Sequence, residues 1–289
     1  MLRKYLDRIK PNFEEGGRLH SFHSVFDGIE TFLYTPRTTS ASGVHIHDSL
    51  DSKRIMIIVV LALMPCLLFG MYNTGYQNFL GSGAASFPLL PIMAYGFLAI
   101  LPKIAVTYVV GLGIEFIAAQ WRKEEIQEGF LVTGILVPLI CPIETPLWML
   151  AVATAFSVIF VKEVFGGTGY NIFNVALVTR AFLFFAYPAS MSGDRAFISA
   201  SPICGIGGTV NFADGISGAT PLGQIATHSG GALQIHNIVG DPVSNWDAFL
   251  GLIPGSFGET STLCILIGAA LLLTTGIASW RIMLSVFAG

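Results

Sequence analysis

The sequence predicts an all-α, polytopic membrane protein, and three observations point to this class. Of its 289 residues, 53% are hydrophobic and only 11% are charged, whereas soluble domains carry about 25% charged residues. The mean hydropathy is +0.68, and several apolar runs approach the roughly 20 residues with which a helix crosses a bilayer. The net charge of −3 lacks the basic excess typical of nucleic-acid-binding proteins, so no nucleic-acid partner is expected.

The apolar runs divide the chain into four parts. A polar, cationic N-terminal arm (1–54) precedes five spans in short or broken helices (55–187), an external loop (188–262), and a sixth span with the chain end (263–289). We therefore expect about six spans, over residues 55–72, 98–120, 130–142, 147–164, 172–187 and 263–277.

The second apolar run, residues 88–120, is too long for a single span. It contains Pro102, and proline removes a helix hydrogen bond and clashes with the preceding turn. We therefore expect an interruption at Pro102 and Lys103, with an interfacial or re-entrant piece before the second span.

The distribution of Lys and Arg orients these spans. The arm holds eight of the fifteen such residues, loops 73–87 and 143–146 hold none, and loop 188–262 holds only Arg195. Because cytoplasmic loops are enriched in positive charge, we expect a cytoplasmic N-terminus and a periplasmic 188–262 loop in a bacterial inner membrane.

The external loop contains the motif D-x-x-S-G-A-T, formed by Asp214, Ser217, Gly218, Ala219 and Thr220. It resembles the motif on which a flavin transferase esterifies FMN to a threonine hydroxyl. The small residues before Thr220 give a transferase steric access, and the phosphoester linkage leaves the flavin ring free for tuning by the protein. The alternative is an ordinary turn.

Ionisable residues inside apolar spans are candidates for cofactor or ion handling. Arg180, near the middle of the fifth span, costs ~2.5–3.5 kcal/mol to place at mid-bilayer, so we expect it to pair with Glu115, Glu163 or a ligand oxygen. Its role is either a cofactor or ion-path residue or a structural ion pair. Glu115 and Glu144 are candidates for the ion path, whereas Lys103 could snorkel to the surface without a role.

Several segments together resemble the NqrB family, the B subunits of the bacterial Na⁺-translocating NADH:quinone oxidoreductases. The resemblance covers nearly the whole chain and is far more specific than any one motif. The matching segments include LYTP (33–36), DSKRIM (51–56), EGFLVT (128–133), KEVFGGTG (162–169), RAFLFFAYP (180–188), IPGS (253–256) and GIASWR (276–281).

The resemblance implies a subunit that passes electrons to ubiquinone or menaquinone, coupled to Na⁺ export, and that is not active alone. It implies five partners, the A, C, D, E and F subunits of the complex, and a flavin transferase for maturation. It also implies a ten-helix, urea-transporter-like inverted repeat, of which this chain would be the first part, truncated at the C-terminus. No catalytic residue and no metal site are expected in this chain.

The resemblance also assigns residues. It implies covalent FMN on Thr220 and non-covalent riboflavin held by Thr133, Asn171 and Asn174, with Arg180 as a further candidate. Quinone contacts would cluster at Gly111, Leu112 and Gly113. Leu112 stands where the family pattern has a glycine. Glu115 matches a carboxylate associated with Na⁺ handling.

Three alternatives remain open. The D subunit of the related Rnf complex shares the S-G-A-T attachment motif, although the LYTP segment of the arm favours the quinone reductase. A flavin-free, urea-type channel or permease would carry no covalent cofactor. A structural membrane subunit would have no site of its own. The permease and the structural subunit would both leave Arg180 and residues 214–220 without an explanation.

Overall fold

The structure is a computed structural model that describes most of the spanning region and parts of the rest. The described residues are 8–13, 26, 30, 43–44, 52–83, 86, 88–122, 129–191, 193, 197–198, 218–230 and 234–289. Over these residues the chain is helical, and its only strand-like feature is an isolated bridge between His236 and Pro242. The predicted all-α class is confirmed.

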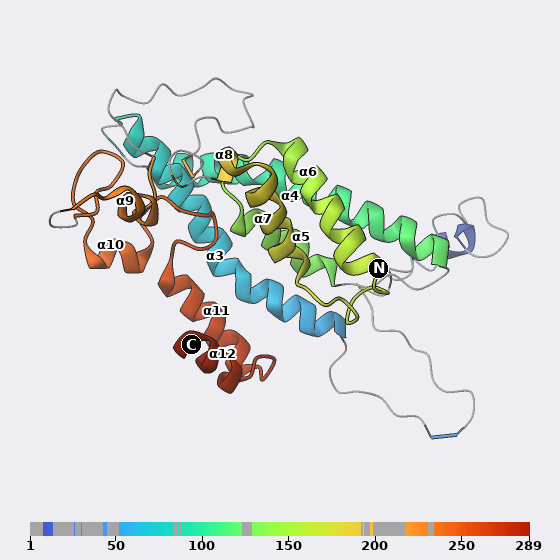
Figure 1. Cartoon of the computed structure of the whole chain (residues 1–289). Coiled ribbons are helices and arrows are strands. Elements are labelled where there is room, and N and C mark those ends of the chain that lie inside the picture. The colour runs from blue at the N-terminus through green and yellow to red at the C-terminus, as the bar shows by residue number, and fades with distance from the viewer. Residues whose placement is uncertain are drawn as a thin grey trace.

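Two long helices, α3 (Ser52–Gly81) and α4 (Leu89–Arg122), form the frame of the molecule (Figure 1). Their 30 and 34 residues correspond to about 45 and 51 Å at the rise of an α-helix, more than the ~30 Å of a bilayer's hydrocarbon core. Both are apolar and long enough to cross a membrane.

Helix α4 runs through Pro102 without a break, so the interruption expected at Pro102 and Lys103 is wrong. Proline removes one N–H, but a membrane helix tolerates this where neighbouring helices enclose it. Helix α4 is enclosed in this way because α3, α5 and α6 all pack along it.

Glycines bring α3 and α4 into direct backbone contact. A Cβ on Gly96 would lie 1.8 Å from the carbonyl oxygen of Met71, and a Cβ on Gly75 would lie 2.1 Å from that of Ile92. Small residues at such contacts allow membrane helices to approach closely and gain packing energy. The antiparallel pair α3–α4 therefore depends on these two glycines.

Shorter helices pack on this frame: α5 (Phe130–Ile140), α6 (Leu147–Ser157) and α7 (Val175–Ala186), followed by the single turn α8 (Pro188–Met191). Helix α6 continues as a π-helix, η3 (Val158–Glu163). Helix α5 has 11 residues, or about 16 Å at 1.5 Å per residue. Its turn to α6 therefore lies beside the middle of α4 rather than at its end.

The remaining elements are η1 (Lys10–Asn12), α9 (Pro221–Thr227), α10 (Asn245–Leu250), α11 (Thr262–Thr274) and α12 (Trp280–Ala288). Helix α11 crosses α3, where a Cβ on Gly268 would lie 2.4 Å from the carbonyl oxygen of Ala62. Helix α12 was not expected from the sequence, and it lies with α11 beyond the main bundle (Figure 1).

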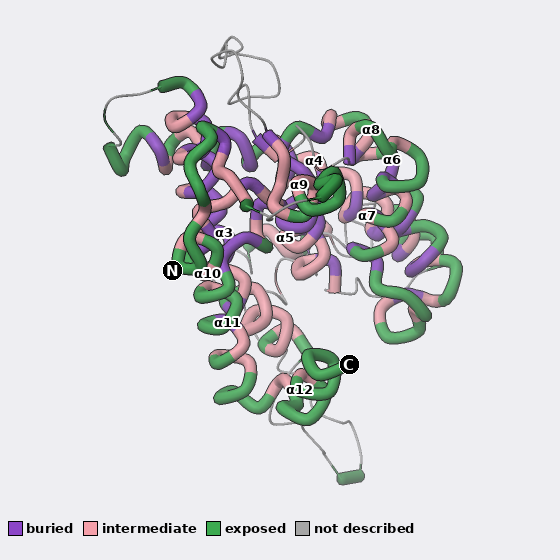
Figure 2. Tube along the Cα trace, turned by 60° about the vertical axis from the view of Figure 1, so that its left-hand side comes forward, coloured by how far each residue is buried: buried purple, intermediate pink, exposed green. Residues whose placement is uncertain are grey.

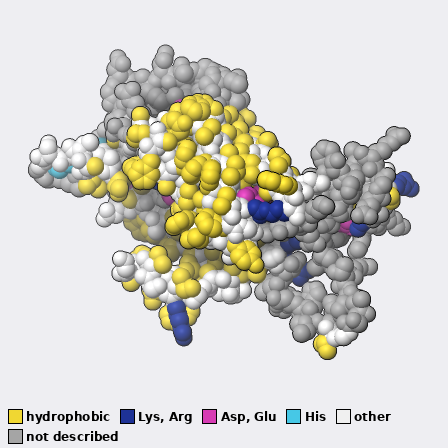
Figure 3. All heavy atoms as spheres, turned by 45° about the vertical axis from the view of Figure 1, so that its right-hand side comes forward, with side chains coloured by type: hydrophobic (Ala, Val, Ile, Leu, Met, Phe, Trp, Pro, Cys, Tyr) yellow, Lys and Arg dark blue, Asp and Glu magenta, His cyan; other side chains and the backbone are white. Residues whose placement is uncertain are grey.

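The outer faces of the bundle are strongly apolar. Val109, Ile117 and Phe185 expose 74%, 70% and 82% of their surface, and hydrophobic side chains cover the middle of the face shown in Figure 3. Buried residues instead concentrate where the helices meet (Figure 2). Apolar patches of this extent mark a membrane or protein interface, in agreement with a membrane protein.

Candidate functional site

The turn between α5 and α6 creates a polar region inside the bundle. Lys103 of α4 is only 1% exposed, and its Nζ donates a hydrogen bond of 2.6 Å to the carbonyl oxygen of Thr145 in this turn. The expectation that Lys103 snorkels to the surface is therefore wrong, because an acceptor lies within reach at depth. Glu144, in the same turn, is exposed.

A second segment enters the bundle beside this turn. Residues 251–261, which precede α11, bring the amide of Gly258 within 2.8 Å of the carbonyl oxygen of Leu139 at the end of α5. The side chain of Asn73 on α3 donates a 2.9 Å hydrogen bond to the carbonyl oxygen of Ile253. Phe257 is 3% exposed and packs with apolar residues of α3, α4 and α5.

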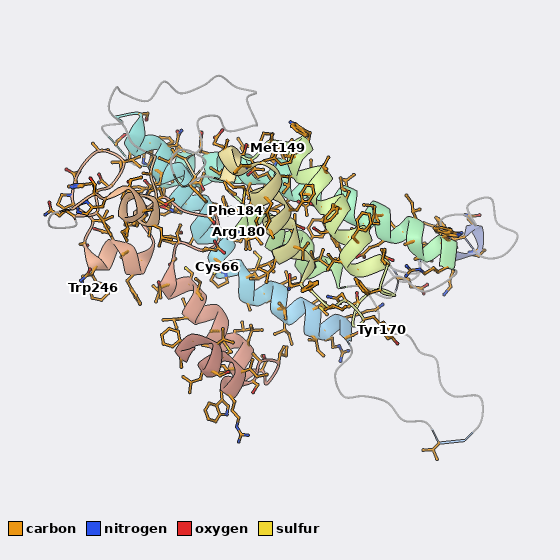
Figure 4. The ribbon with its side chains drawn as sticks, in the orientation of Figure 1. Cys66, Met149, Tyr170, Arg180, Phe184 and Trp246 are labelled. Carbon is orange, nitrogen blue, oxygen red and sulfur yellow. The ribbon has the colours of Figure 1, made fainter. Side chains whose placement is uncertain are left out.

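Arg180 of α7 pairs with Glu259 from this segment. Its Nη1 lies 3.0 and 2.8 Å from the two carboxylate oxygens. Figure 4 shows Arg180 part-way along the bundle, between Met149 at the start of α6 and Tyr170 in the loop before α7.

The two acids expected from the sequence as partners of Arg180 were wrong, because Glu115 and Glu163 are engaged by other cations. Sequence reasoning missed Glu259. Its position in the sequence could have indicated it. Glu259 lies two residues before Ser261, the N-cap of α11, and is therefore an acid at the start of an apolar helix.

Two further ion pairs join α4 to η3. Glu115 accepts a hydrogen bond from the Nζ of Lys162, and both side chains are at most 5% exposed. One residue further along, Glu163 lies 3.2 Å from Arg122, and this pair is more exposed. Glu115 is therefore interior, as expected from the sequence, but an ammonium already occupies one of its oxygens.

The residues expected to hold riboflavin lie at the Tyr170 end of the bundle. Asn174 caps α7 and accepts hydrogen bonds from the amides of Ala176 and Leu177, at 2.9 and 3.2 Å. Asn171 accepts from the amide of Gly169 and donates to the carbonyl oxygen of Phe173. All these bonds are local, so both amides shape the loop.

Thr133, near the start of α5, lies at the same end of the bundle. Its hydroxyl donates a long, 3.4 Å hydrogen bond to the carbonyl oxygen of Gly129. A Cβ on Gly129 would lie 2.7 Å from the Oγ1 of Thr168, which precedes Asn171 in the chain. The structure thus brings the loop before α5 and the loop before α7 into contact.

The three residues expected near quinone have different surroundings. A Cβ on Gly111 would lie 1.8 Å from the ring of Phe130, whereas a Cβ on Gly113 would meet nothing within 4 Å. Leu112 is half-buried and packs against the cluster that contains Phe130, Val158 and Val175. Gly111 is therefore a packing position between α4 and α5, and Gly113 faces open space.

Thr220 is the N-cap of α9. Its Oγ1 accepts a 3.1 Å hydrogen bond from the amide of Gly223, and its own amide donates to the carbonyl oxygen of Gly193 at 2.8 Å. Gly218 is buried, and Ala219 and Thr220 are half-buried. Two other residues of the expected motif, Asp214 and Ser217, lie outside the described residues.

Comparison with known proteins finds a matching family model and a group of similar, named proteins. The model of the family described as NQR2, RnfD, RnfE matches residues 39–289. Three similar proteins, each named as the B subunit of a Na(+)-translocating NADH-quinone reductase, come from Chromohalobacter salexigens (42% identical), Azotobacter vinelandii (43%) and Pseudomonas aeruginosa (41%). Each match covers 100% of this chain and 70%, 73% and 72% of the relative, respectively.

Proposed function

Because the chain belongs to the NQR2, RnfD, RnfE family, we propose that it is the flavin-carrying membrane subunit of a Na⁺-pumping NADH:quinone reductase. In this role it passes electrons through FMN and riboflavin to quinone while Na⁺ is exported. The observation that carries the proposal is the agreement over the whole chain with proteins named as the B subunit of this reductase.

The surroundings of Thr220 support FMN attachment. Its hydroxyl oxygen lies beside two glycines, and a Cβ on Gly193 or Gly223 would approach it to 3.0 or 3.3 Å. The absence of side chains at both positions leaves room for a phosphoryl group beside Thr220, the N-cap of α9. FMN supplies electron-transfer chemistry, while the protein holds it in place.

The Tyr170 end of the bundle suits a non-covalent riboflavin. Side-chain amides match the mixed donors and acceptors of a flavin ring. The Oδ1 of Asn174 is used by the helix start, whereas its Nδ2 donates no hydrogen bond within the described part of the chain. In this proposal the Nδ2 of Asn174 donates to the flavin, with Asn171 and Thr133 alongside.

The α4 helix carries the proposed quinone and ion functions. Gly113 leaves open space beside Leu112, where a flat quinone ring could lie. Glu115, two residues after Gly113, would supply a buried carboxylate to Na⁺, and Glu144, exposed in the turn between α5 and α6, would be a second carboxylate of the path. Arg180 and Glu259 would keep the segment before α11 in place beside this path.

In the membrane we propose about six spans, with the N-terminus in the cytoplasm and Thr220 on the periplasmic side of a bacterial inner membrane. The Arg122–Glu163 pair supports this orientation, because it brings the end of α4, which carries Arg122, beside the end of η3, which carries Lys162. The proposed partners are the A, C, D, E and F subunits, and a flavin transferase attaches the FMN. The fold would be the first part of a urea-transporter-like repeat.

A denaturing gel tests the flavin assignment. The chain is co-expressed with a flavin transferase, and the gel is viewed under ultraviolet light beside a Thr220→Ala variant. A fluorescent band that disappears in the variant supports covalent FMN on Thr220. A dark wild-type band, beside a fluorescent known flavinylated subunit, contradicts it and favours a flavin-free permease.

The choice of electron donor separates the two redox branches of the family. Membranes that contain the assembled complex should reduce quinone with NADH in a Na⁺-dependent manner. Activity that instead requires ferredoxin as the redox partner would assign the chain to the Rnf branch, with which it shares the family model.

A further inference from the structure

The Glu115–Lys162 pair places an acidic and a basic side chain together in the interior of the bundle. Their side chains are 3% and 5% exposed and come from two helices that pack face to face, α4 and the α6–η3 rod. Apolar residues of similar volume would stabilise such an interface equally well or better. Ionisable residues retained inside a membrane protein instead indicate a function.

The ammonium leaves part of the carboxylate unused. Lys162 binds Oε1 of Glu115, while the buried Oε2 has no hydrogen-bond partner among the described residues. An ionised carboxylate has room for several donors or cations on its two oxygens. Lys162 therefore acts as a single, tethered monovalent cation on one side of an incompletely filled site.

Lys162 also has a route away from Glu115. It lies in the last turn of η3, next to Glu163. The Glu163–Arg122 pair at this end of the bundle is partly accessible, with side chains 14% and 34% exposed. A lysine at a helix end can extend its flexible stem so that the ammonium reaches water. The π-helical geometry of η3 is itself a feature often found at functional sites.

We propose that the ammonium of Lys162 is a built-in competitor of the transported cation at Glu115. With no Na⁺ bound, Lys162 neutralises the carboxylate; when Na⁺ binds Glu115, the ammonium withdraws toward Glu163 and the aqueous end of the bundle. The carboxylate is neutralised in both states, so neither state requires it to take up a proton. This inference rests on the proposed Na⁺-pumping function.

Removal of the competitor must tighten Na⁺ binding. If Lys162 occupies Glu115 for about nine-tenths of the time, the apparent dissociation constant for Na⁺ is raised about tenfold. The Lys162→Met variant of the assembled complex should therefore need about tenfold less Na⁺ for half-maximal quinone reduction and for equilibrium binding of radioactive Na⁺. Lys162→Arg should need more Na⁺, because a guanidinium can hold both carboxylate oxygens.

Two controls make the result specific. Arg281→Met removes an exposed cation of α12 and should leave the Na⁺ requirement unchanged. Adding Glu115→Gln to Lys162→Met should abolish the tighter Na⁺ binding, since that binding requires the carboxylate of Glu115. Covalent flavin fluorescence and the recovery of assembled complex report folding, and Lys162→Gln, which keeps a polar side chain, replaces the methionine variant if that variant does not assemble.

An unchanged or weaker Na⁺ affinity in an assembled variant without the Lys162 charge would overturn the competitor role. The same change of Na⁺ requirement in Lys162→Met and Arg281→Met would show that the Glu115–Lys162 pair has no specific part in Na⁺ binding. A wild-type complex whose quinone reduction and Na⁺ binding show no Na⁺ dependence would instead contradict the proposed function itself, independently of Lys162.

Discussion

Arg180, in the middle of α7, holds both carboxylate oxygens of Glu259, a residue 79 positions later in the chain, at 3.0 and 2.8 Å. This pair ties the fifth predicted span to the segment that enters the bundle just before α11. The amide of Gly258 adds a backbone hydrogen bond from the same segment to the end of α5. Residues 251–261 are thus held in the bundle from two sides.

We expect Glu259→Gln to weaken this attachment only slightly. The side chains of Arg180 and Glu259 are 36% and 46% exposed, and exposed ion pairs contribute about 0–1 kcal/mol. Glu259→Lys should be much more harmful, because it places two cations side by side. Thermal unfolding of the detergent-solubilised complex measures the stability of both variants. The charge-swapped double variant Arg180→Glu with Glu259→Arg should recover part of the stability lost in Glu259→Lys.

Lys103→Met should destabilise the turn between α5 and α6. The variant keeps most of the apolar stem but removes the donor to the carbonyl oxygen of Thr145, and a lost charged hydrogen bond in a buried place costs about 1.5–3 kcal/mol. Arg281→Met on the exposed face of α12 is the matched control and should be neutral. Equal unfolding temperatures for the two variants would show that Lys103 is not needed for this turn.

Gly111→Ala and Gly113→Ala should have opposite effects, although both lie in α4. A methyl group on Gly111 would overlap the buried ring of Phe130, whereas one on Gly113 meets open space. Overpacking costs roughly 1–3 kcal/mol, while Gly→Ala in a helix interior gains up to about 1 kcal/mol. We expect a lower unfolding temperature for the first variant and an equal or higher one for the second.

Activity measurements on the same pair address quinone binding. If Gly113→Ala raises stability and also raises the Michaelis constant for quinone, the open space beside Gly113 is used by quinone. A variant with unchanged quinone kinetics would contradict a quinone contact at this position.

Asn174→Ala should loosen the start of α7 by about 1 kcal/mol, the usual effect of losing an N-cap. Asn174→Asp keeps the oxygen that accepts from the amides of Ala176 and Leu177, so it should fold like the wild type. The aspartate lacks the amide donor, however, and should retain less riboflavin. Extraction of non-covalent flavin from both purified variants measures the riboflavin content. A full riboflavin content in Asn174→Asp would contradict the proposed donor role of Asn174.

The elements that could be predicted from sequence are those in which apolar runs are long and uniform. The segments expected at 55–72, 130–142 and 147–164 correspond to α3, α5 and the α6–η3 rod, with α3 nine residues longer at its C-terminal end. Composition and run length decide these helices, because burial in lipid requires apolar side chains over the whole length of a span. The continuity of α4 at Pro102 depends on packing and was therefore missed.

The candidate site follows the same division. Local sequence patterns indicated Thr220, Glu115 and Arg180 as candidate functional residues, since the S-G-A-T motif and charged residues within apolar runs can be recognised from the sequence alone. Their partners are remote: Lys162 for Glu115 and Glu259 for Arg180. No periodicity or local spacing encodes a contact between residues 47 or 79 positions apart.

The sequence by itself determined that this is an all-helical membrane protein, which of its segments are apolar, and which family it resembles. Only the tertiary structure decided that Lys103 is buried against Thr145, that the space beside Gly111 is filled by Phe130, and which acid pairs with Arg180 and which with Lys162. The physical reason is that hydrophobicity acts residue by residue, whereas a buried charge or a close glycine contact depends on what another helix brings to the same place.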